Sequence, residues 1–194
     1  LEIYTESVAV TFENIHLQED FRETQKELVY ILANAVEARA QKSGAHAERV
    51  AIASEMLARL SGLPDAQVQL IYNASPLHDI GKVAIPDSIL CKPGKLDADE
   101  WKLMQQHSQH GADVLQYSQR PLMRMAAEIA LSHHERWDGT GCPSGISGTV
   151  IPISARIVAL ADVFDSLGSN LVYREAWAPD AVASAIREGS GKQF

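Results

Sequence analysis

The sequence of 194 residues has only two cysteines and no long hydrophobic run. Cys91 and Cys142 form no C-x-x-C motif, which favours a reduced cytoplasmic setting. No stretch approaches the roughly 18 consecutive apolar residues that a membrane helix needs, and no signal-peptide pattern is present. These absences predict a cytoplasmic protein without a membrane partner.

Positive charge is also scarce, because 17 lysines and arginines stand against 25 aspartates and glutamates, for a net charge of -8. Duplex nucleic acid is therefore not expected as a partner, since proteins that bind it are basic. A small anionic substrate remains compatible with this charge, because bound metal cations can reverse the local field. The length and the 46% hydrophobic content suit one globular domain.

Strand signals are weak, whereas apolar residues recur at helical spacing along most of the chain. Only residues 150–153 have a strand-like composition, and Pro152 interrupts them. The spacing predicts helices at about 28–36, 45–60, 65–78, 97–107, 121–134 and 153–167, with a short last helix from Pro179 and a loop over 81–96. Asp97 and Glu100 resemble a capping box. The predicted fold class is all-α, a compact multi-helix bundle.

Residues 1–27 have a less regular apolar pattern than the rest of the chain. Two interpretations stay open: a lead-in helix or linker from an upstream regulatory domain, or a packed N-terminal helix of the same domain. In the first interpretation, residues 28–194 form the functional domain.

Histidine and aspartate gather at the predicted helix ends. The candidate ligands are His46, His78, Asp79, His107, His133, His134 and Asp162. Asp162 lies within the apolar run I-V-A-L-A-D-V-F-D, where a charge must be paired or coordinated. Imidazole and carboxylate together suit divalent first-row metals, so the set predicts a two-metal centre. Taken singly, His46 could be a capping side chain. His107, in the middle of a predicted helix, could be a surface residue.

Three segments carry a resemblance to a known family. H-D-I-G-K, H-H-E-R-W-D-G-T-G-C-P-S-G and I-S-A-R-I-V-A-L-A-D-V-F-D-S-L resemble the HD-GYP family, bacterial phosphodiesterases of cyclic di-GMP within the HD superfamily of metal-dependent phosphohydrolases. The resemblance covers roughly residues 27–194. It implies an HD-type bundle with a metal centre in its core and hydrolysis of cyclic di-GMP to pGpG or GMP. It also implies an output domain that follows a receiver or sensor domain in the chain, and it is compatible with a homodimer.

The resemblance also assigns roles to individual positions. His46, His78, Asp79 and Asp162 are implied to bind one ion and Asp79, His107, His133 and His134 a second, with Asp79 as the bridge. The two divalent ions are expected to be iron or manganese, with zinc, nickel, magnesium or calcium also able to occupy the site. Asp79 and Lys82 are the implied catalytic residues. Lys82, Cys142, Asp165 and Arg174 are the expected substrate contacts.

The chain departs from the family pattern at three places. Cys142 stands for the tyrosine of G-Y-P, and Leu171 stands for an arginine that grips a substrate phosphate, while Arg174 keeps the neighbouring positive charge. Lys42 stands for the glutamate that binds a third metal, which predicts two ions. The alternatives are a catalytically weak cyclic-dinucleotide-binding or protein-interaction module, and a hydrolase of another cyclic nucleotide.

The glycines of W-D-G-T-G-C-P-S-G are expected to let the backbone turn sharply and approach the site. Trp137 and Asp138 are expected to pack and shape this loop rather than to take part in catalysis.

Overall fold

The computed structural model describes residues 2–40, 45–170 and 175–194. Within these ranges the secondary structure is helical, without strands, which confirms the all-α prediction. The α-helices are α1 (Glu2–Arg39), α2 (His46–Leu60), α3 (Asp65–Ala74), α4 (Asp87–Leu90), α5 (Ala98–Gln105), α6 (His107–Leu115), α7 (Pro121–Ser132), α8 (Ile153–Gly168) and α9 (Pro179–Glu188). Three short 3-10 helices are η1 (Ser75–Leu77), η2 (Ile80–Ala84) and η3 (Gly148–Val150).

The helix predicted over 97–107 begins as expected but divides before His107. Asp97 and Glu100 form the predicted capping box at the start of α5. The helix is interrupted at Gln106, so His107 begins α6 instead of lying in mid-helix. The His107 imidazole donates from Nδ1 to the carbonyl of Met104 at 2.6 Å. A side chain that takes a helical carbonyl competes with the backbone ladder, which accounts for the break.

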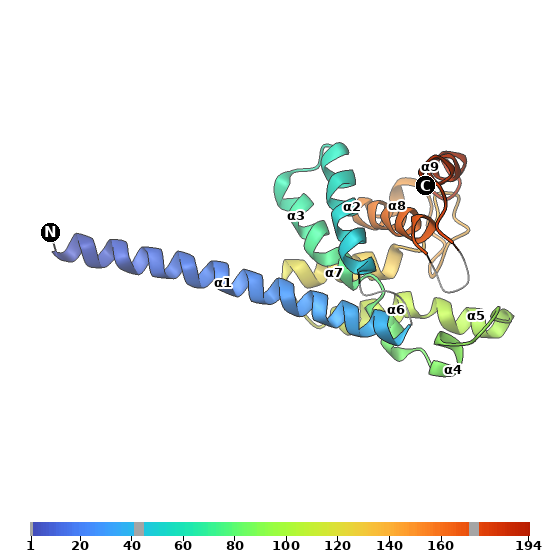
Figure 1. The fold of residues 1–194 in the computed structure, drawn as a ribbon, viewed down its shortest axis with the longest axis horizontal. Helices are drawn as coiled ribbons and strands as arrows, with labels where there is room; N and C mark the ends of the chain where they lie inside the picture. The colour runs from blue at the N-terminus through green and yellow to red at the C-terminus, as the bar shows by residue number, and fades with distance from the viewer. Residues whose placement is uncertain (1, 41–44, 171–174) are drawn as a thin grey trace.

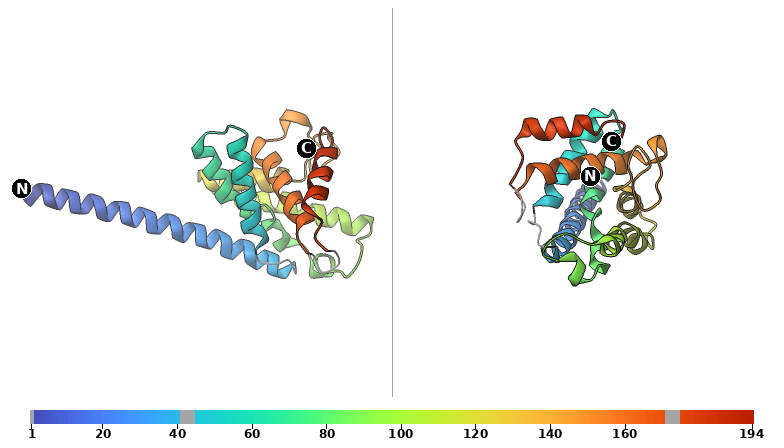
Figure 2. Two further views of the ribbon diagram at one scale, coloured as in Figure 1. Left: turned by 45° about the horizontal axis from the view of Figure 1, so that its top comes forward. Right: turned by 90° about the vertical axis from the view of Figure 1, so that its right-hand side faces the viewer.

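The hydrophobic core lies between α2, α3, α7 and α8. Its fully buried members include Val50 on α2, Ile71 on α3, Ile129 on α7 and Val158 on α8. Figures 1 and 2 show α2 between α3 and α8, with α7 crossing behind them and α6 lying along α7. Because a close-packed core resists displacement, it holds the ends of α2 and α7 in place relative to α8.

Helix α1 runs unbroken through residue 27 and extends well beyond the bundle, as Figure 1 shows. Every side chain from residue 10 to residue 25 is exposed. Further along, Val29, Ala33 and Val36 are buried against the rest of the protein. The helix therefore has a projecting N-terminal part and a packed C-terminal part. No helix within the described ranges combines the length and the apolar character that crossing a membrane requires.

Candidate metal centre

The structure brings all seven predicted metal ligands together as two adjoining groups. In each group the potential ligand atoms lie within 4.8 Å of one another. The first group is His46, His78 and Asp162, and the second is Asp79, His107, His133 and His134. The seven come from the start of α2, the η1–η2 junction, the start of α6, the end of α7 and the middle of α8.

Asp79 belongs to the second group and also faces the first. Its Oδ1 is 3.3 Å from His107 Nε2 in the second group, and its Oδ2 is 3.5 Å from His78 Nε2 in the first. The two groups also adjoin through their rings, because the centroids of His78 and His133 are 5.3 Å apart. A carboxylate in this position can offer one oxygen to each of two cations.

Backbone carbonyls orient three of the imidazoles in the same way. Nδ1 of His78 donates to Ser75 at 2.8 Å, that of His107 to Met104, and that of His133 to Ala130 at 3.0 Å. A carbonyl can only accept, so in each ring Nδ1 carries the hydrogen and Nε2 keeps its lone pair.

These three Nε2 atoms are buried and have no hydrogen-bond partner within the described part of the chain. Buried polar atoms nearly always have a partner, so three such lone pairs, all within reach of Asp79, are suited to bind a cation. The donor set of imidazole nitrogens and carboxylate oxygens, without thiolate, fits divalent first-row metals. These residues therefore fit a metal centre.

His46 is oriented by a carboxylate instead of a carbonyl. Its Nδ1 donates to Asp165 Oδ2 at 2.7 Å, which leaves Nε2 facing Asp162 Oδ1 at 3.3 Å. Arg49, one turn along α2, donates to both oxygens of Asp165, at 2.5 Å and 3.0 Å. Asp165 is expected from the sequence to contact substrate, but in the structure it is buried behind His46 with both oxygens engaged by protein groups. Sequence reasoning missed Arg49, whose side chain gives no local signal.

The electrostatics of the centre favour the neutral forms of His133 and His134. Burial lowers the pKa of His134 to about 4, with a further contribution from His107. Burial also holds the pKa of His133 well below its usual value, and the neighbouring His134 adds to this effect. Burial alone would raise the pKa of Asp165, but hydrogen bonds from His46 and Arg49 outweigh it, so this pKa lies below its usual value. At neutral pH His133 and His134 are thus neutral imidazoles, and Asp165 is an ionised carboxylate.

Lys82 lies at the edge of this centre. Its ammonium contacts the carboxylate of Asp79, and its side chain is largely buried. The lysine expected to contact the scissile phosphate is thus within one turn of the residue that lies between both groups.

Two glycines allow the segment that carries Asp79 to approach α6. A Cβ atom on Gly81 would lie 1.9 Å from the carbonyl oxygen of His107 and 2.3 Å from the nitrogen of Gly111. A Cβ atom on Gly111 would itself lie 3.0 Å from that of Ala130 on α7. The glycine of H-D-I-G-K is therefore required because η2 and α6 touch backbone to backbone, which places His107 beside Asp79.

The loop after His134 folds back in the way its glycines predict. A Cβ atom on Gly141 would lie 2.6 Å from the carbonyl oxygen of His134, and Gly139 and Gly145 have positive φ angles of 78° and 63°. The buried Glu135 accepts from the backbone nitrogen of Ser144 at 2.7 Å and so holds the loop closed.

Cys142, an expected substrate contact, is partly exposed in this loop, and burial together with Glu135 raises the pKa of its thiol. The expected structural roles of Trp137 and Asp138 are confirmed. The Arg156 guanidinium lies 4.8 Å above the Trp137 ring, and Asp138 accepts from the backbone and hydroxyl of Thr140.

Arg39, at the end of α1, binds the segment that carries Lys82. Its guanidinium donates to the carbonyls of Lys82, Val83 and Ile85 at 2.7–3.0 Å and pairs with Asp87 at 2.8 Å. Sequence reasoning missed this contact, since the partners lie more than forty residues apart along the chain. The last turn of α1 is thereby fixed to η2.

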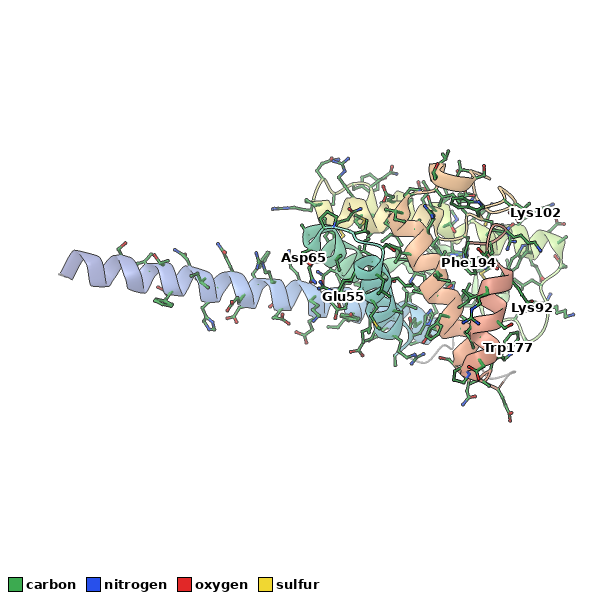
Figure 3. The ribbon with its side chains drawn as sticks, turned by 90° about the horizontal axis from the view of Figure 1, so that it is seen from above. Glu55, Asp65, Lys92, Lys102, Trp177 and Phe194 are labelled. Carbon is green, nitrogen blue, oxygen red and sulfur yellow. The ribbon has the colours of Figure 1, made fainter. Side chains whose placement is uncertain are left out.

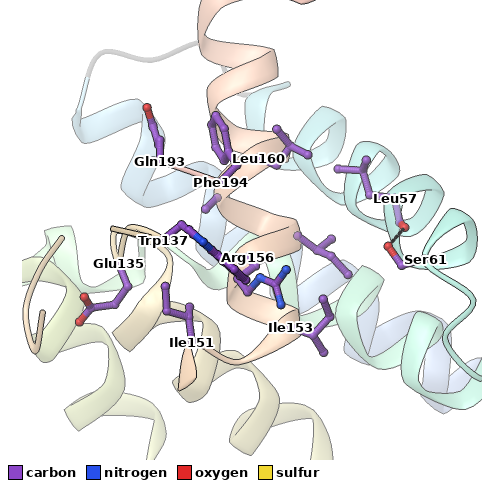
Figure 4. A pocket seen from close by; sticks show the side chains of 12 residues that line it. Leu57, Ser61, Glu135, Trp137, Ile151, Ile153, Arg156, Leu160, Gln193 and Phe194 are labelled. Atoms are coloured by element: carbon purple, nitrogen blue, oxygen red, sulfur yellow. Dashed lines mark hydrogen bonds between the residues drawn. The ribbon is translucent and has the colours of Figure 1, made fainter. Parts of the chain in front are cut away.

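A cavity of about 150 Å³ lies beside α8, away from the histidines. Figure 4 shows Trp137, Arg156 and Phe194 around it, with Leu57 on the far wall. None of the seven candidate ligands lines this cavity, so it is separate from the metal centre.

Lys42, Leu171 and Arg174, on which three predictions depend, lie outside the described residues.

A family model described as HD domain matches residues 30–194. The chain belongs to the HD domain family. This confirms the HD-GYP resemblance, and the HD-type fold agrees with a solved neighbour, a cyclic GMP-AMP specific phosphodiesterase of Vibrio cholerae. That structure superposes with a TM-score of 0.66 at 20% identity, covering 87% of this chain and 45% of the neighbour.

Two curated relatives of this HD domain are named for different cyclic dinucleotides. The 3'3'-cGAMP-specific phosphodiesterase 2 of Vibrio cholerae is 55% identical over all of this chain and 37% of the relative. The cyclic di-GMP phosphodiesterase response regulator RpfG of Xanthomonas campestris is 44% identical over 90% of this chain and 46% of the relative. The chain thus spans less than half the length of either relative.

Proposed function

We propose that this HD domain is a metal-dependent phosphodiesterase of cyclic dinucleotides. The observation that carries the proposal is the pair of adjoining ligand groups, in which three buried imidazole Nε2 atoms face Asp79 and have no hydrogen-bond partner among the described residues. The names of the two curated relatives support a cyclic dinucleotide as the substrate class.

His46, His78, Asp79 and Asp162 would hold one divalent ion, and Asp79, His107, His133 and His134 a second. We propose iron or manganese for both. When bound, such ions supply Lewis-acid chemistry, neutralising charge on a phosphoryl oxygen and lowering the pKa of water.

The chain's own residues prepare this chemistry. The carbonyls of Ser75, Met104 and Ala130 keep three imidazoles in the tautomer that presents Nε2. Lys82 is held beside Asp79. In the proposed reaction its positive charge would stabilise the negative charge that grows on the phosphate during in-line attack. The expected product of one hydrolytic step is a linear dinucleotide.

The preferred substrate is a finer question, for which we propose 3'3'-cGAMP ahead of cyclic di-GMP. The basis is the 55% identity over the full chain to a relative named as specific for 3'3'-cGAMP, compared with 44% for a relative named for cyclic di-GMP. Hydrolysis of cyclic di-GMP to pGpG, which the sequence resemblance implies, is the second candidate. A comparison of kcat/KM for the two substrates on manganese-loaded protein, with separation of linear products by chromatography, decides between them.

The metal assignment is tested with Asp79→Ala. Because Asp79 lies between both groups, its loss should remove both ions and all hydrolysis. The matched control is His16→Ala, which replaces an exposed histidine on the projecting part of α1. Retention of two ions by the Asp79 variant, measured by elemental analysis, would contradict the bridging role, whereas a metal-loaded native protein that cleaves neither dinucleotide contradicts the proposed activity.

We also propose that residues 1–27 connect an upstream receiver or sensor domain to the HD domain at 28–194. The matched segments make up only 37% and 46% of the two curated relatives, and one of these relatives is named a response regulator. The projecting part of α1 is in the position that such a connector requires (Figure 1).

A further inference from the structure

Helix α1 has an exposed apolar stripe that nothing within the described part of the chain covers. Counted in heptads, residues 14, 21, 28 and 35 occupy one core position and residues 10, 17, 24 and 31 the other. The large apolar members are Val10, Leu17, Phe21, Leu28 and Ile31, each more than half exposed. A repeat that alternates steps of three and four residues is typical of a coiled-coil seam.

The stripe continues over the part of α1 that packs on the domain, but on another side of the helix. Leu28 and Ile31 are exposed, whereas Val29, Ala33 and Val36 are buried. With about 100° of rotation per residue, the two sets point roughly 130° apart. The domain therefore leaves the stripe accessible. Figure 3 shows the projecting part of α1 clear of the other helices.

An unsupported helix of this length also needs a partner for its stability. Residues 2–28 extend for roughly 40 Å at about 1.5 Å per residue. Helices in proteins are stabilised mainly by packing of an apolar face, not by propensity alone. The side chains of residues 10–25 have no such packing in a single chain.

The polar residues of the repeat favour a second copy in parallel orientation. Asn14 occupies a core position of the type where asparagine specifies two strands and one register. The flanking positions that precede this core position are acidic, namely Glu6, Glu13, Asp20 and Glu27. The flanking positions on the other side are uncharged, namely Thr11, Gln18, Gln25 and Leu32.

Charge then separates the two orientations. In a parallel pair, each acidic flank faces an uncharged flank of the partner, for example Glu13 opposite Gln18. In an antiparallel pair, acidic flanks face one another, and like charges across a seam repel. We propose that a second copy of this chain pairs with the first along α1 as a parallel, in-register, two-stranded coiled coil.

Because Arg39 ties the last turn of this helix to η2, the pairing would join two metal centres in one dimer. The proposal needs neither metal nor substrate, so its failure and the failure of the proposed phosphodiesterase activity are distinguishable.

Sedimentation equilibrium of the 194-residue chain tests the pairing. The native chain should dimerise, and Phe21→Glu should raise the dissociation constant at least tenfold. The matched control is Phe12→Glu, the same substitution at an equally exposed phenylalanine outside the stripe, which should leave the dissociation constant unchanged. Circular dichroism verifies that both variants remain helical. A native chain that is monomeric at every concentration overturns the proposal. The stripe would then pack against a segment outside this sequence. Equal dissociation by both variants, or by neither, also overturns it.

Oxidative cross-linking tests the orientation. In a parallel pair, Val10→Cys places two thiols side by side, so a disulfide-linked dimer should form. Glu19→Cys, on the outer side of the same helix, should not cross-link above the level of the native chain. A dimer in which Val10→Cys fails to cross-link is not parallel and in register, and the proposal is then wrong.

Discussion

Asp165→Asn separates the orientation of a metal ligand from the ligand itself. The carboxylate receives the Nδ1 hydrogen of His46 at 2.7 Å, and so turns Nε2 toward Asp162. The amide of asparagine has nearly the same shape and can still accept this hydrogen, but without charge. The variant therefore keeps every candidate ligand of both groups.

The expected loss follows from the change in that hydrogen bond. A hydrogen bond to a charged group contributes about 1.5–3 kcal/mol, and a neutral one about 0.5–1.5 kcal/mol. The difference of roughly 1–2 kcal/mol corresponds to a 5–30-fold loss of affinity, since about 1.4 kcal/mol is tenfold. Loss of a partner behind a metal-ligating histidine typically weakens metal binding about 10–100-fold, which agrees. The ion held by His46, His78 and Asp162 should be affected, and the other ion should change little.

Competition of the metal-free protein with a chromophoric chelator, titrated with manganese or zinc, measures both affinities. Asp65→Asn is the control, because Asp65 also pairs with an arginine, Arg59 at 2.9 Å, on an exposed surface. Urea unfolding of each variant separates a loss of affinity from a loss of fold. Unchanged affinity at the first group, or equal weakening at both, would refute the orienting role of Asp165.

Three further substitutions test the surroundings of the centre. Gly81→Ala should force η2 away from α6 and lower the free energy of unfolding in urea by about 1–3 kcal/mol, with loss of metal at the group of His107. The control is Gly168→Ala, whose added Cβ atom meets no atom within 4 Å and should leave the free energy of unfolding unchanged. Arg39→Met removes hydrogen bonds to three carbonyls and should lower the free energy of unfolding by roughly 2–3 kcal/mol, detectable as a lower Tm. An unchanged Tm would contradict the view that Arg39 fixes α1 to η2. Hydrogen bonds from Thr140 lower the pKa of Asp138 to about 2. The ionised Asp138 therefore stabilises the fold above about pH 4, and this stabilisation is lost as pH falls toward 2. The difference in stability between the native protein and Asp138→Asn should shrink over that window.

Most helices of this protein can be predicted from its sequence, because helical periodicity and capping depend on residues only a few positions apart. Asp97 and Glu100 are three residues apart and predict the start of α5 correctly. The ligand set is also readable as residue types, since paired histidines and an aspartate inside an apolar run have few purely structural roles. The heptad stripe of α1 was readable too, but its polar core positions make the local pattern look irregular.

Only the tertiary structure decides which distant side chains meet. Asp165 lies 119 residues from His46, and Arg39 lies 46 residues from Ile85, yet each pair is within hydrogen-bond distance. Such contacts depend on how α2 packs on α8 and how α1 ends against η2, and no local pattern encodes either arrangement. The same holds for His107, whose helix breaks because its imidazole takes a carbonyl from the preceding turn while its own backbone carbonyl lies against Gly81. Residue types and spacing thus specify the donors of the metal centre, whereas packing of the helices aims their lone pairs at one place.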